Sequence, residues 1–223
     1  MKLLIKLPTK QRLRAFNKCF HSIVKHAQGE HTLHVAVTID RDDKIMNCLD
    51  VARKVNNADI SATIYKGSWG GKVAAINGAM DTITDWDAAI ILHDDMMLEE
   101  NFDAIVASQM QSGTNQLVTF RDNDIFDYGY VLVVGRLFYE SNGYLVSHDY
   151  IANAYDDDVI EQAKATDRLT ICDTILVKHT HYDDPVSIAS WVYADKDYEL
   201  LNKRYPPIPP SDLKPCGCHR SKG

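Results

Sequence analysis

The sequence predicts an α/β protein, a Rossmann-like mixed sheet flanked by helices, in a single domain with a C-terminal extension. Up to residue 92, short aliphatic runs rich in β-branched residues alternate with segments whose apolar residues recur at helical spacing. Polar or glycine-rich stretches follow several expected strands, as in sheets that bind ligands beyond the strand ends. With 223 residues, 45% of them hydrophobic and 25% charged, the chain can bury one large core.

Strands and helices are expected in alternation along the first half. The expected strands are rich in Leu, Ile, Val or Ala and cover residues 3–7, 33–39, 61–66 and 88–92. The expected helices carry their apolar residues on one face and cover residues 13–27, 45–55 and 72–82. Because ligands bind at the carboxyl ends of such strands, one rim is expected to gather residues 7–12, 40–43, 67–72 and 93–97.

The second half is less regular. Helices are expected over residues 102–110, 156–165 and 191–201, and strands over 116–120, 130–134 and 171–177. Proline lacks the amide donor and restricts the residue before it, so the run from Tyr205 to Pro210 cannot continue the last helix. We therefore expect a domain over 1–200, with halves 1–100 and 101–200, and a proline-rich, basic tail over 201–223.

Charge, hydropathy and cysteine content exclude several classes of protein. The net charge of −7 excludes a uniformly basic surface for nucleic acid. The N-terminal apolar run is too short for a signal peptide and no later run could span a bilayer, which predicts a cytoplasmic protein. Five cysteines, an odd number, argue against a disulfide framework. Cys216, Cys218 and His219 have ligand-like spacing but lack a second cluster.

Two adjacent carboxylates, Asp94 and Asp95, follow the strand expected at 88–92. Like charges side by side repel, so solvent, a basic partner or a cation has to offset them. A solvated turn is one interpretation, since aspartate is common where strands end. The polar residues at the other strand ends favour a bound cation instead.

Seven segments carry a resemblance to a known family. In order along the chain they are Pro8-Thr9-Lys10-Gln11-Arg12, Asp40, Gly71–Asn77, His93-Asp94-Asp95-Met96, Gly143-Tyr144, Tyr155–Val159 and His179-Thr180-His181. The set resembles family 2 glycosyltransferases with the GT-A fold, including small viral or phage members, and covers residues 2–182. The resemblance implies transfer of a hexosyl or pentosyl group, with inversion, from a nucleotide-diphosphate sugar to an acceptor hydroxyl. A UDP-sugar is the favoured donor.

The resemblance assigns donor binding to residues at four strand ends, namely Pro8, Thr9, Arg12, Asp40, Lys72, Asn77 and Asp94. Asp40 would accept hydrogen bonds from the nucleobase, although an aspartate there can also cap the following helix. Lys72 follows two glycines that let a ligand approach the backbone, and its charge suits phosphate. An exposed lysine in the first turn of a helix is the alternative interpretation.

The resemblance also implies Mn²⁺ or Mg²⁺ bound by Asp95, by Asp94 beside it, and by His179 or His181. A divalent cation offsets the negative charge that grows on a departing diphosphate, and such ions prefer oxygen ligands. Manganese also accepts nitrogen. His93 stands where the family often has a further acid, so the sequence departs from the family pattern at that position.

Inverting transfer needs a general base that takes the proton from the acceptor hydroxyl. The resemblance assigns this role to Asp156, or to Asp157 if the alignment shifts by one residue, with Asp158 as a structural partner. Three acids in the first turn of a helix are also favoured by the helix dipole alone.

The resemblance implies that the acceptor is a glycan, or DNA with hydroxymethylated bases, which some small viral members of the family modify. The basic residues of the tail suit a polyanion of this kind. Two other classes of protein remain open. A nucleotidyltransferase that makes nucleotide sugars would be expected to carry a glycine-rich loop after the first strand, and Leu7–Arg12 contains no glycine. A non-catalytic module that binds nucleotide sugars or glycans would not need the acids at 94, 95 and 156. A viral enzyme would act in the host cytoplasm.

Overall fold

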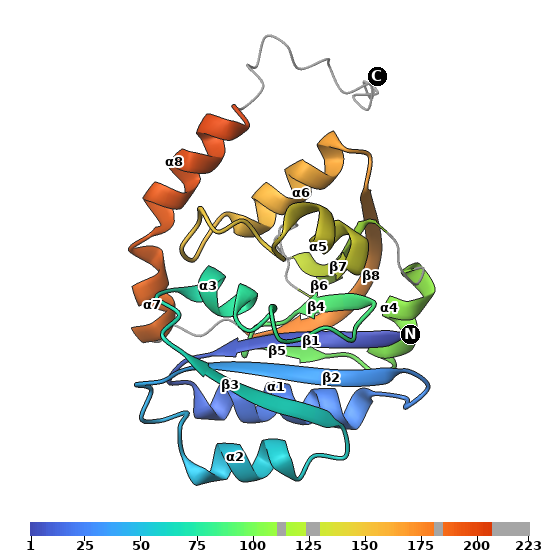
Figure 1. Cartoon of the computed structure of the whole chain (residues 1–223), viewed down its shortest axis with the longest axis vertical. Coiled ribbons are helices and arrows are strands. Elements are labelled where there is room, and N and C mark those ends of the chain that lie inside the picture. Colours follow the sequence, from blue (N-terminus) through green and yellow to red (C-terminus); the bar gives the residue numbers. More distant parts are fainter. Residues whose placement is uncertain (111–114, 124–129, 181–184, 207–223) are drawn as a thin grey trace, which may run out of the picture.

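The computed structural model describes residues 1–110, 115–123, 130–180 and 185–206 (Figure 1). Its strands are β1 (Lys2–Thr9), β2 (Thr32–Asp40), β3 (Ser61–Gly67), β4 (Ala88–Ile91), β5 (Met96–Leu98), β6 (Leu117–Asp122), β7 (Tyr130–Gly135) and β8 (Leu169–His179). Its helices are α1 (Leu13–His26), α2 (Leu49–Asn56), α3 (Lys72–Asn77), α4 (Phe102–Gln109), α5 (Arg136–Asn142), α6 (Tyr155–Ala165), α7 (Pro185–Trp191) and α8 (Ala194–Arg204).

The strands of the described residues form one mixed sheet in the order β3-β2-β1-β4-β7-β6-β8-β5. The first four strands of this order run parallel. β7 is antiparallel to both β4 and β6, while β8 is parallel to β6 and antiparallel to β5. The predicted fold class, a mixed sheet flanked by helices, is confirmed.

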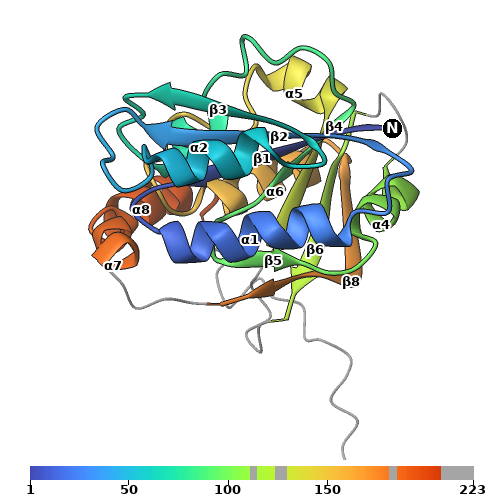
Figure 2. The ribbon, with the colours of Figure 1, turned by 90° about the horizontal axis from the view of Figure 1, so that it is seen from below.

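Alternate residues of β1 contribute to two hydrophobic cores, because successive side chains of a strand point to opposite faces of the sheet. Leu3, Ile5 and Leu7 pack in one core with α1, α2 and α4. Leu4 belongs to the other core, which α3, α5 and α6 line. Figure 2 shows α1 and α2 lying along the same side of β1, β2 and β3. The two cores fix the sheet between two layers of helices. The loops at the ends of the strands can then form a site.

The short helix α3 is attached to the sheet by two buried side chains. Lys6 Nζ donates to the carbonyl oxygen of Gly78 at 2.6 Å, and Thr38 Oγ1 donates to that of Ala75 at 2.9 Å. Carbonyls at the end of a helix have no partner within it, so these bonds act as caps. Burial lowers the pKa of Lys6 to about 7. The arrangement holds the other end of α3, which begins at Lys72, at the rim of the sheet.

The predicted elements occur with shifted ends. The helix expected over 72–82 ends at Asn77, and the helix expected from residue 45 begins at Leu49 because Asp43 holds the amides of Ile45 and Met46 in a turn. The helix expected over 191–201 is replaced by α7 and α8. β5, α5 and α7 are not predicted from the sequence, because three to seven residues are too few for a periodic signal.

Over the described residues, no helix combines the length and the apolar character needed to cross a bilayer. Among the described residues, Cys19, Cys48 and Cys172 are free thiols. Cys216, Cys218 and His219 lie outside the described residues, as does the tail from residue 207. The division of the chain at residues 100 and 200 stays a prediction.

Candidate functional site

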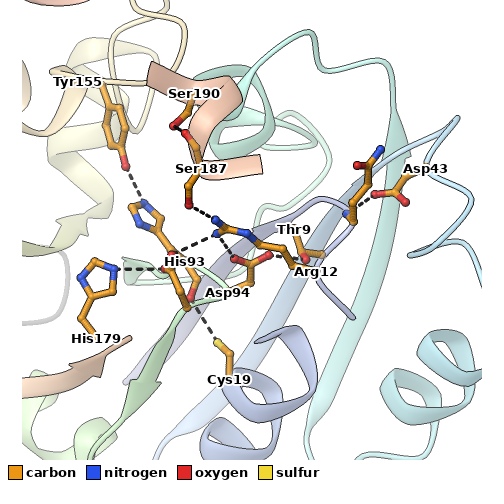
Figure 3. A network of polar contacts seen from close by, with 12 residues as sticks. Thr9, Arg12, Cys19, Asp43, His93, Asp94, Tyr155, His179, Ser187 and Ser190 are labelled. Carbon is orange, nitrogen blue, oxygen red and sulfur yellow. Dashed lines mark hydrogen bonds and ion pairs between the residues drawn. The ribbon is translucent and has the colours of Figure 1, made fainter. Parts of the chain in front are cut away.

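Side chains from the end of β1 meet the two carboxylates that follow β4, as the sequence predicts. Thr9 Oγ1 donates to Asp94 Oδ2 at 2.8 Å. Arg12 Nη1 lies 3.1 Å from Asp94 Oδ1 and 3.2 Å from Asp95 Oδ2, so one nitrogen bridges both carboxylates. Figure 3 shows the Arg12 guanidinium between Asp94 and Ser187 of α7, to which it also donates a hydrogen bond. The like charges of the pair are therefore offset in part by an arginine.

The two carboxylates have opposite electrostatic environments. Burial raises the pKa of Asp94 to about 6, although Arg12 and the hydrogen bond from Thr9 act in the other direction. Burial also acts to raise the pKa of Asp95, but contact with His179 and the charges of His179 and Arg12 hold it well below its usual range. At neutral pH Asp95 is the firmly ionised member of the pair.

The pairing of β5 with β8 brings His179 to Asp95. Met96 is opposite His179 in this antiparallel ladder, and the amide of Thr180 donates to the carbonyl of Asp95 at 2.9 Å. His179 Nε2 lies 3.4 Å from Asp95 Oδ1, and its Nδ1 lies 3.1 Å from Asp122 Oδ2. Although burial acts against it, these two acids raise the pKa of His179. His181, the other candidate histidine, lies outside the described residues.

Asp122, at the end of β6, was not singled out from the sequence. It is buried, and it orients the ring of His179 from the side opposite Asp95. The sequence does contain a signal for it. Asp122 comes just after the strand expected at 116–120, in the same way that Asp94 and Asp95 come just after the strand expected at 88–92.

His93, the departure from the family pattern, contacts α6. Its Nε2 lies 2.6 Å from the hydroxyl oxygen of Tyr155. Lys72 Nζ lies 5.4 Å from the centre of the Tyr155 ring, so a cation stands beside this pair. Burial, aided by the charge of Lys72, holds the pKa of His93 well below its usual range, and the imidazole is neutral at pH 7. His93 is thus an uncharged link between the β4 loop and α6.

Asp40 lies at the same rim, bound by neighbouring loops. Its Oδ2 lies 2.8 Å from Lys10 Nζ, and its Oδ1 accepts a hydrogen bond from the Trp69 amide at 3.1 Å. The interpretation of Asp40 as a helix cap is wrong, since α2 begins after Cys48 and Asp43 makes the turn between. Pro8 is buried at the end of β1.

The Trp69 indole explains two of the nearby glycines. Its Nε1 donates to the carbonyl of Ile39 at 3.1 Å. A Cβ at Gly67 would lie 2.6 Å from the Trp69 ring, and one at Gly78 would lie 2.7 Å from it. Both positions therefore need glycine. The packing of the indole against them fixes Trp69, whose backbone amide binds Asp40.

Asn77 makes contacts within the protein. Its Oδ1 accepts from the amides of Leu145 and Val146 at 2.9 and 3.3 Å, and its Nδ2 donates to the carbonyl of Val146 at 2.7 Å. These bonds join the end of α3 to the loop before α6. They account for Asn77 as a structural residue, so we leave it out of the donor site proposed below.

The three acids at the start of α6 have different surroundings. Asp158 is fully buried and accepts hydrogen bonds from Tyr150, Gln162 and Arg204. Asp156 and Asp157 are partly exposed. Burial lowers the pKa of Lys72, and the charge of Asp156 acts in the other direction; burial raises the pKa of Tyr155, and the charge of Asp156 adds to that shift. Asp156 therefore lies near the rim. Burial, together with Asp156 and Glu161, raises the pKa of Asp157 to about 6.

A polar cavity of about 550 Å³ lies further along α6. It is lined by Tyr144, Ser147, His148, Asp149, Gln162, Arg204 and Tyr205. The buried carboxylate of Asp158 binds Gln162 and Arg204, and so fixes two walls of the cavity.

The residues at the rim fit a divalent cation that a ligand helps to coordinate. Asp95 Oδ1 is buried and has no hydrogen-bond partner among the described residues, and it faces His179 Nε2. No group of three or more His, Cys, Asp or Glu side chains within the described ranges is arranged to hold a metal. Such a two-residue site suits Mg²⁺ or Mn²⁺, which are commonly bound by one or two carboxylates, with phosphates and water completing the shell.

Comparison with known proteins identifies the fold. No family model and no curated protein sequence matches the chain. S. aureus TarS 1–349 in complex with UDP-GlcNAc has a TM-score of 0.70 and 12% identity over 91% of this chain and 65% of that one. The mannosyltransferase PcManGT from Pyrobaculum calidifontis, in complex with GDP-Man and Mn²⁺, has a TM-score of 0.70 and 13% identity over 91% and 64%.

A third structure is glucosyl-3-phosphoglycerate synthase from Mycobacterium tuberculosis, in complex with Mg²⁺ and UDP. It has a TM-score of 0.64 and 12% identity over 92% of this chain and 79% of that one. The chain thus spans slightly less than two thirds of the first two proteins. At these identities the likeness shows the fold alone, which is that of GT-A glycosyltransferases.

Proposed function

We propose that this protein is a glycosyltransferase that moves a sugar from a nucleotide-diphosphate sugar to an acceptor hydroxyl, with Mn²⁺ or Mg²⁺. One observation carries the proposal. Asp95 faces His179 at 3.4 Å, with Arg12 and Lys72 close by, at the rim of a fold that nucleotide-sugar enzymes share. The arrangement combines ligands for a divalent cation with cations for a diphosphate.

Asp95 and His179 would hold the metal, with Asp94 beside them. When bound, the ion offsets the charge of the diphosphate as its bond to the sugar breaks. Asp122 orients His179 so that Nε2 is the nitrogen turned to Asp95. Arg12 and Lys72 supply two more positive charges for the phosphates.

The donor nucleotide would lie between the ends of β1, β2 and β3. Pro8 and Thr9 form the end of β1 at this part of the rim, and the Trp69 amide holds the carboxylate of Asp40 there, in position to accept hydrogen bonds from a nucleobase. TarS and the synthase were solved with UDP-GlcNAc and UDP, and PcManGT with GDP-Man. A UDP-sugar is the donor we test first.

Asp156 is the proposed general base. In a single displacement, the acceptor oxygen forms a bond to the anomeric carbon and gives its proton to the carboxylate of Asp156. The bond from the anomeric carbon to the phosphate oxygen breaks, and the nucleoside diphosphate leaves with the electron pair, which inverts the anomeric centre. The electrostatic effect of Asp156 on Lys72 supports this choice over Asp157, whose charged neighbours include Glu161 and Lys164 on α6 itself.

The cavity along α6 favours a glycan as the acceptor. Its lining combines aromatic rings with hydroxyl, amide and charged groups, and Arg204 in it is paired with Asp149 and Asp158. A DNA acceptor would need unpaired cations. Three of the basic residues of the tail, Lys214, Arg220 and Lys222, lie outside the described residues.

The test is nucleotide release from UDP-, GDP- and TDP-sugars with Mn²⁺ and a panel of sugar acceptors. Asp95→Asn and Asp156→Asn should each lower turnover by about 100-fold or more, since removing a base or a metal ligand has effects of that order. Asp59→Asn, at an exposed acid just before the start of β3, the end of that strand opposite the rim, is the matched control. Full activity in excess chelator would show that the reaction does not need a divalent cation. Release of pyrophosphate from a nucleoside triphosphate and a sugar phosphate would indicate the nucleotidyltransferase instead.

A further inference from the structure

Arg12 is held in a fixed position between the two carboxylates and α7. Its carbonyl accepts a hydrogen bond from the Phe16 amide in the first turn of α1, and Gln11 before it is bound through its amide to Asp43 at 2.7 Å. The Arg12 side chain is 11% exposed. One of its terminal nitrogens contacts Asp94 and Asp95, and the other donates to Ser187.

The same carboxylates are the proposed metal ligands. Arg12 contacts Asp95 at Oδ2, while Oδ1 of the same group faces His179. A divalent cation at Oδ1 would therefore lie within a few bond lengths of a buried guanidinium. Two cations that close repel each other unless an anion comes between them or one of them gives up its contact.

We propose that Arg12 is the resident counter-ion of the Asp94–Asp95 pair, and that it competes with a divalent cation for them until a diphosphate accepts its hydrogen bonds. This inference rests on the proposed function, because the diphosphate is that of the donor. It makes metal and nucleotide bind cooperatively: the metal alone is opposed by Arg12, whereas metal and diphosphate together satisfy both cations. The protein thereby discriminates against metal without donor.

The competition between Arg12 and the metal also affects α7, because Arg12 donates a hydrogen bond to Ser187 on that helix. None of the residues of α7 is buried, and Trp191 at its end is 67% exposed. Polar contacts join this helix to the rim, namely the bond between Arg12 and Ser187 and the bond from Asn153 Nδ2 to the carbonyl of Ser190 at 2.9 Å. A change of partner by Arg12 would therefore change one of the contacts that hold α7.

The test is calorimetric titration of the full chain with Mn²⁺ alone, and with UDP in the presence of Mn²⁺. Arg12→Gln removes the charge, and we expect it to tighten binding of Mn²⁺ alone by about tenfold and to weaken binding of UDP by a similar factor. The two ligands are thus expected to change in opposite directions. Arg12→Lys keeps a charge, but its single nitrogen cannot contact the carboxylates and Ser187 at once as the two terminal nitrogens of Arg12 do, so its affinities should lie between those of Arg12→Gln and the unsubstituted protein. Ser187→Ala, which leaves the guanidinium with the acids, should leave the affinity for Mn²⁺ alone unchanged.

Equal or weaker binding of Mn²⁺ by folded Arg12→Gln would overturn the inference, even if the unsubstituted protein binds Mn²⁺ and UDP as the proposed function requires. Failure of the unsubstituted protein to bind either ligand would overturn both. If Arg12→Gln does not fold, the Nε–Hε resonance of Arg12 in the unsubstituted protein supplies the test. It should shift more on addition of UDP with Mg²⁺ than with UDP or Mg²⁺ alone, and a shift that is the sum of the two separate shifts would contradict the competition.

Discussion

Asp95 and His179 face each other at 3.4 Å although they lie in different halves of the chain, because Met96 pairs with His179 across β5 and β8. A strand of three residues directly after the carboxylate pair thus brings His179 to it. His179 is in turn held by Asp122, at the end of β6.

Asp122→Asn is expected to weaken binding of Mn²⁺, measured with UDP present, by about tenfold, because groups that orient a metal-binding histidine have effects of that size. His179→Ala should weaken it more, since it removes the nitrogen ligand itself. Asp173→Asn, at an exposed acid on β8, is the control and should leave the affinity unchanged. An unchanged affinity in His179→Ala would contradict the assignment of the ligand.

The buried lysine predicts a pH dependence of stability. Burial lowers the pKa of Lys6 to about 7 from an ordinary value of 10.5, so between these two values the unfolded chain binds more protons than the folded one. Stability therefore rises with pH over that window, by up to about 1.4 kcal/mol per pH unit for this group. Below pH 7 the charged amine is buried and its full cost is present.

Urea unfolding of the unsubstituted protein and of Lys6→Met at pH 7, 8 and 9 isolates this effect. The free energy of unfolding of the unsubstituted protein should rise relative to that of Lys6→Met as the pH increases. A difference that stays constant over the three pH values would show that Lys6 does not titrate in the folded state.

Asp156 and Asp158 are expected to behave in opposite ways. Asp158→Ala should lower the free energy of unfolding by about 3 kcal/mol, because it removes a fully buried carboxylate that accepts hydrogen bonds from Tyr150, Gln162 and Arg204. Asp156→Ala should change stability by less than about 1 kcal/mol, since the side chain is partly exposed, and should abolish turnover. Comparable loss of stability in both variants would mean that Asp156 is also structural.

Gly78→Ala is expected to weaken UDP binding by about tenfold, because the new Cβ would lie 2.7 Å from the Trp69 ring and displace the residue that binds Asp40. Gly143→Ala is the matched control. Its Cβ meets nothing within 4 Å, but its φ of +78° strains an alanine, so it should cost about 1 kcal/mol of stability and leave UDP binding intact. Equal UDP affinity in Gly78→Ala and the unsubstituted protein would show that Trp69 does not contribute to the donor site.

The helix and strand pattern and the convergence of the strand ends follow from the sequence. Aliphatic runs and helical spacing locate β1 to β4 and α1, and because parallel strands carry their loops at one edge, contacts such as that of Thr9 with Asp94 are expected. The resemblance to GT-A glycosyltransferases agrees with the fold. The short elements β5, α5 and α7 cannot be predicted this way, because they are formed by tertiary packing rather than by a periodic pattern.

The sequence by itself therefore determined the fold class and the place of the carboxylate pair, since both depend on local hydrophobic periods and on the geometry of parallel strands. Only the tertiary structure decided which atoms contact that pair. Arg12 bridges Asp94 and Asp95, His179 faces Asp95, and Asp122 contacts His179, through packing between distant segments that no local pattern encodes. Burial, which shifts the pKa of Asp94 to about 6, is likewise a property of the packed molecule, because it depends on which side chains exclude water from the carboxylate.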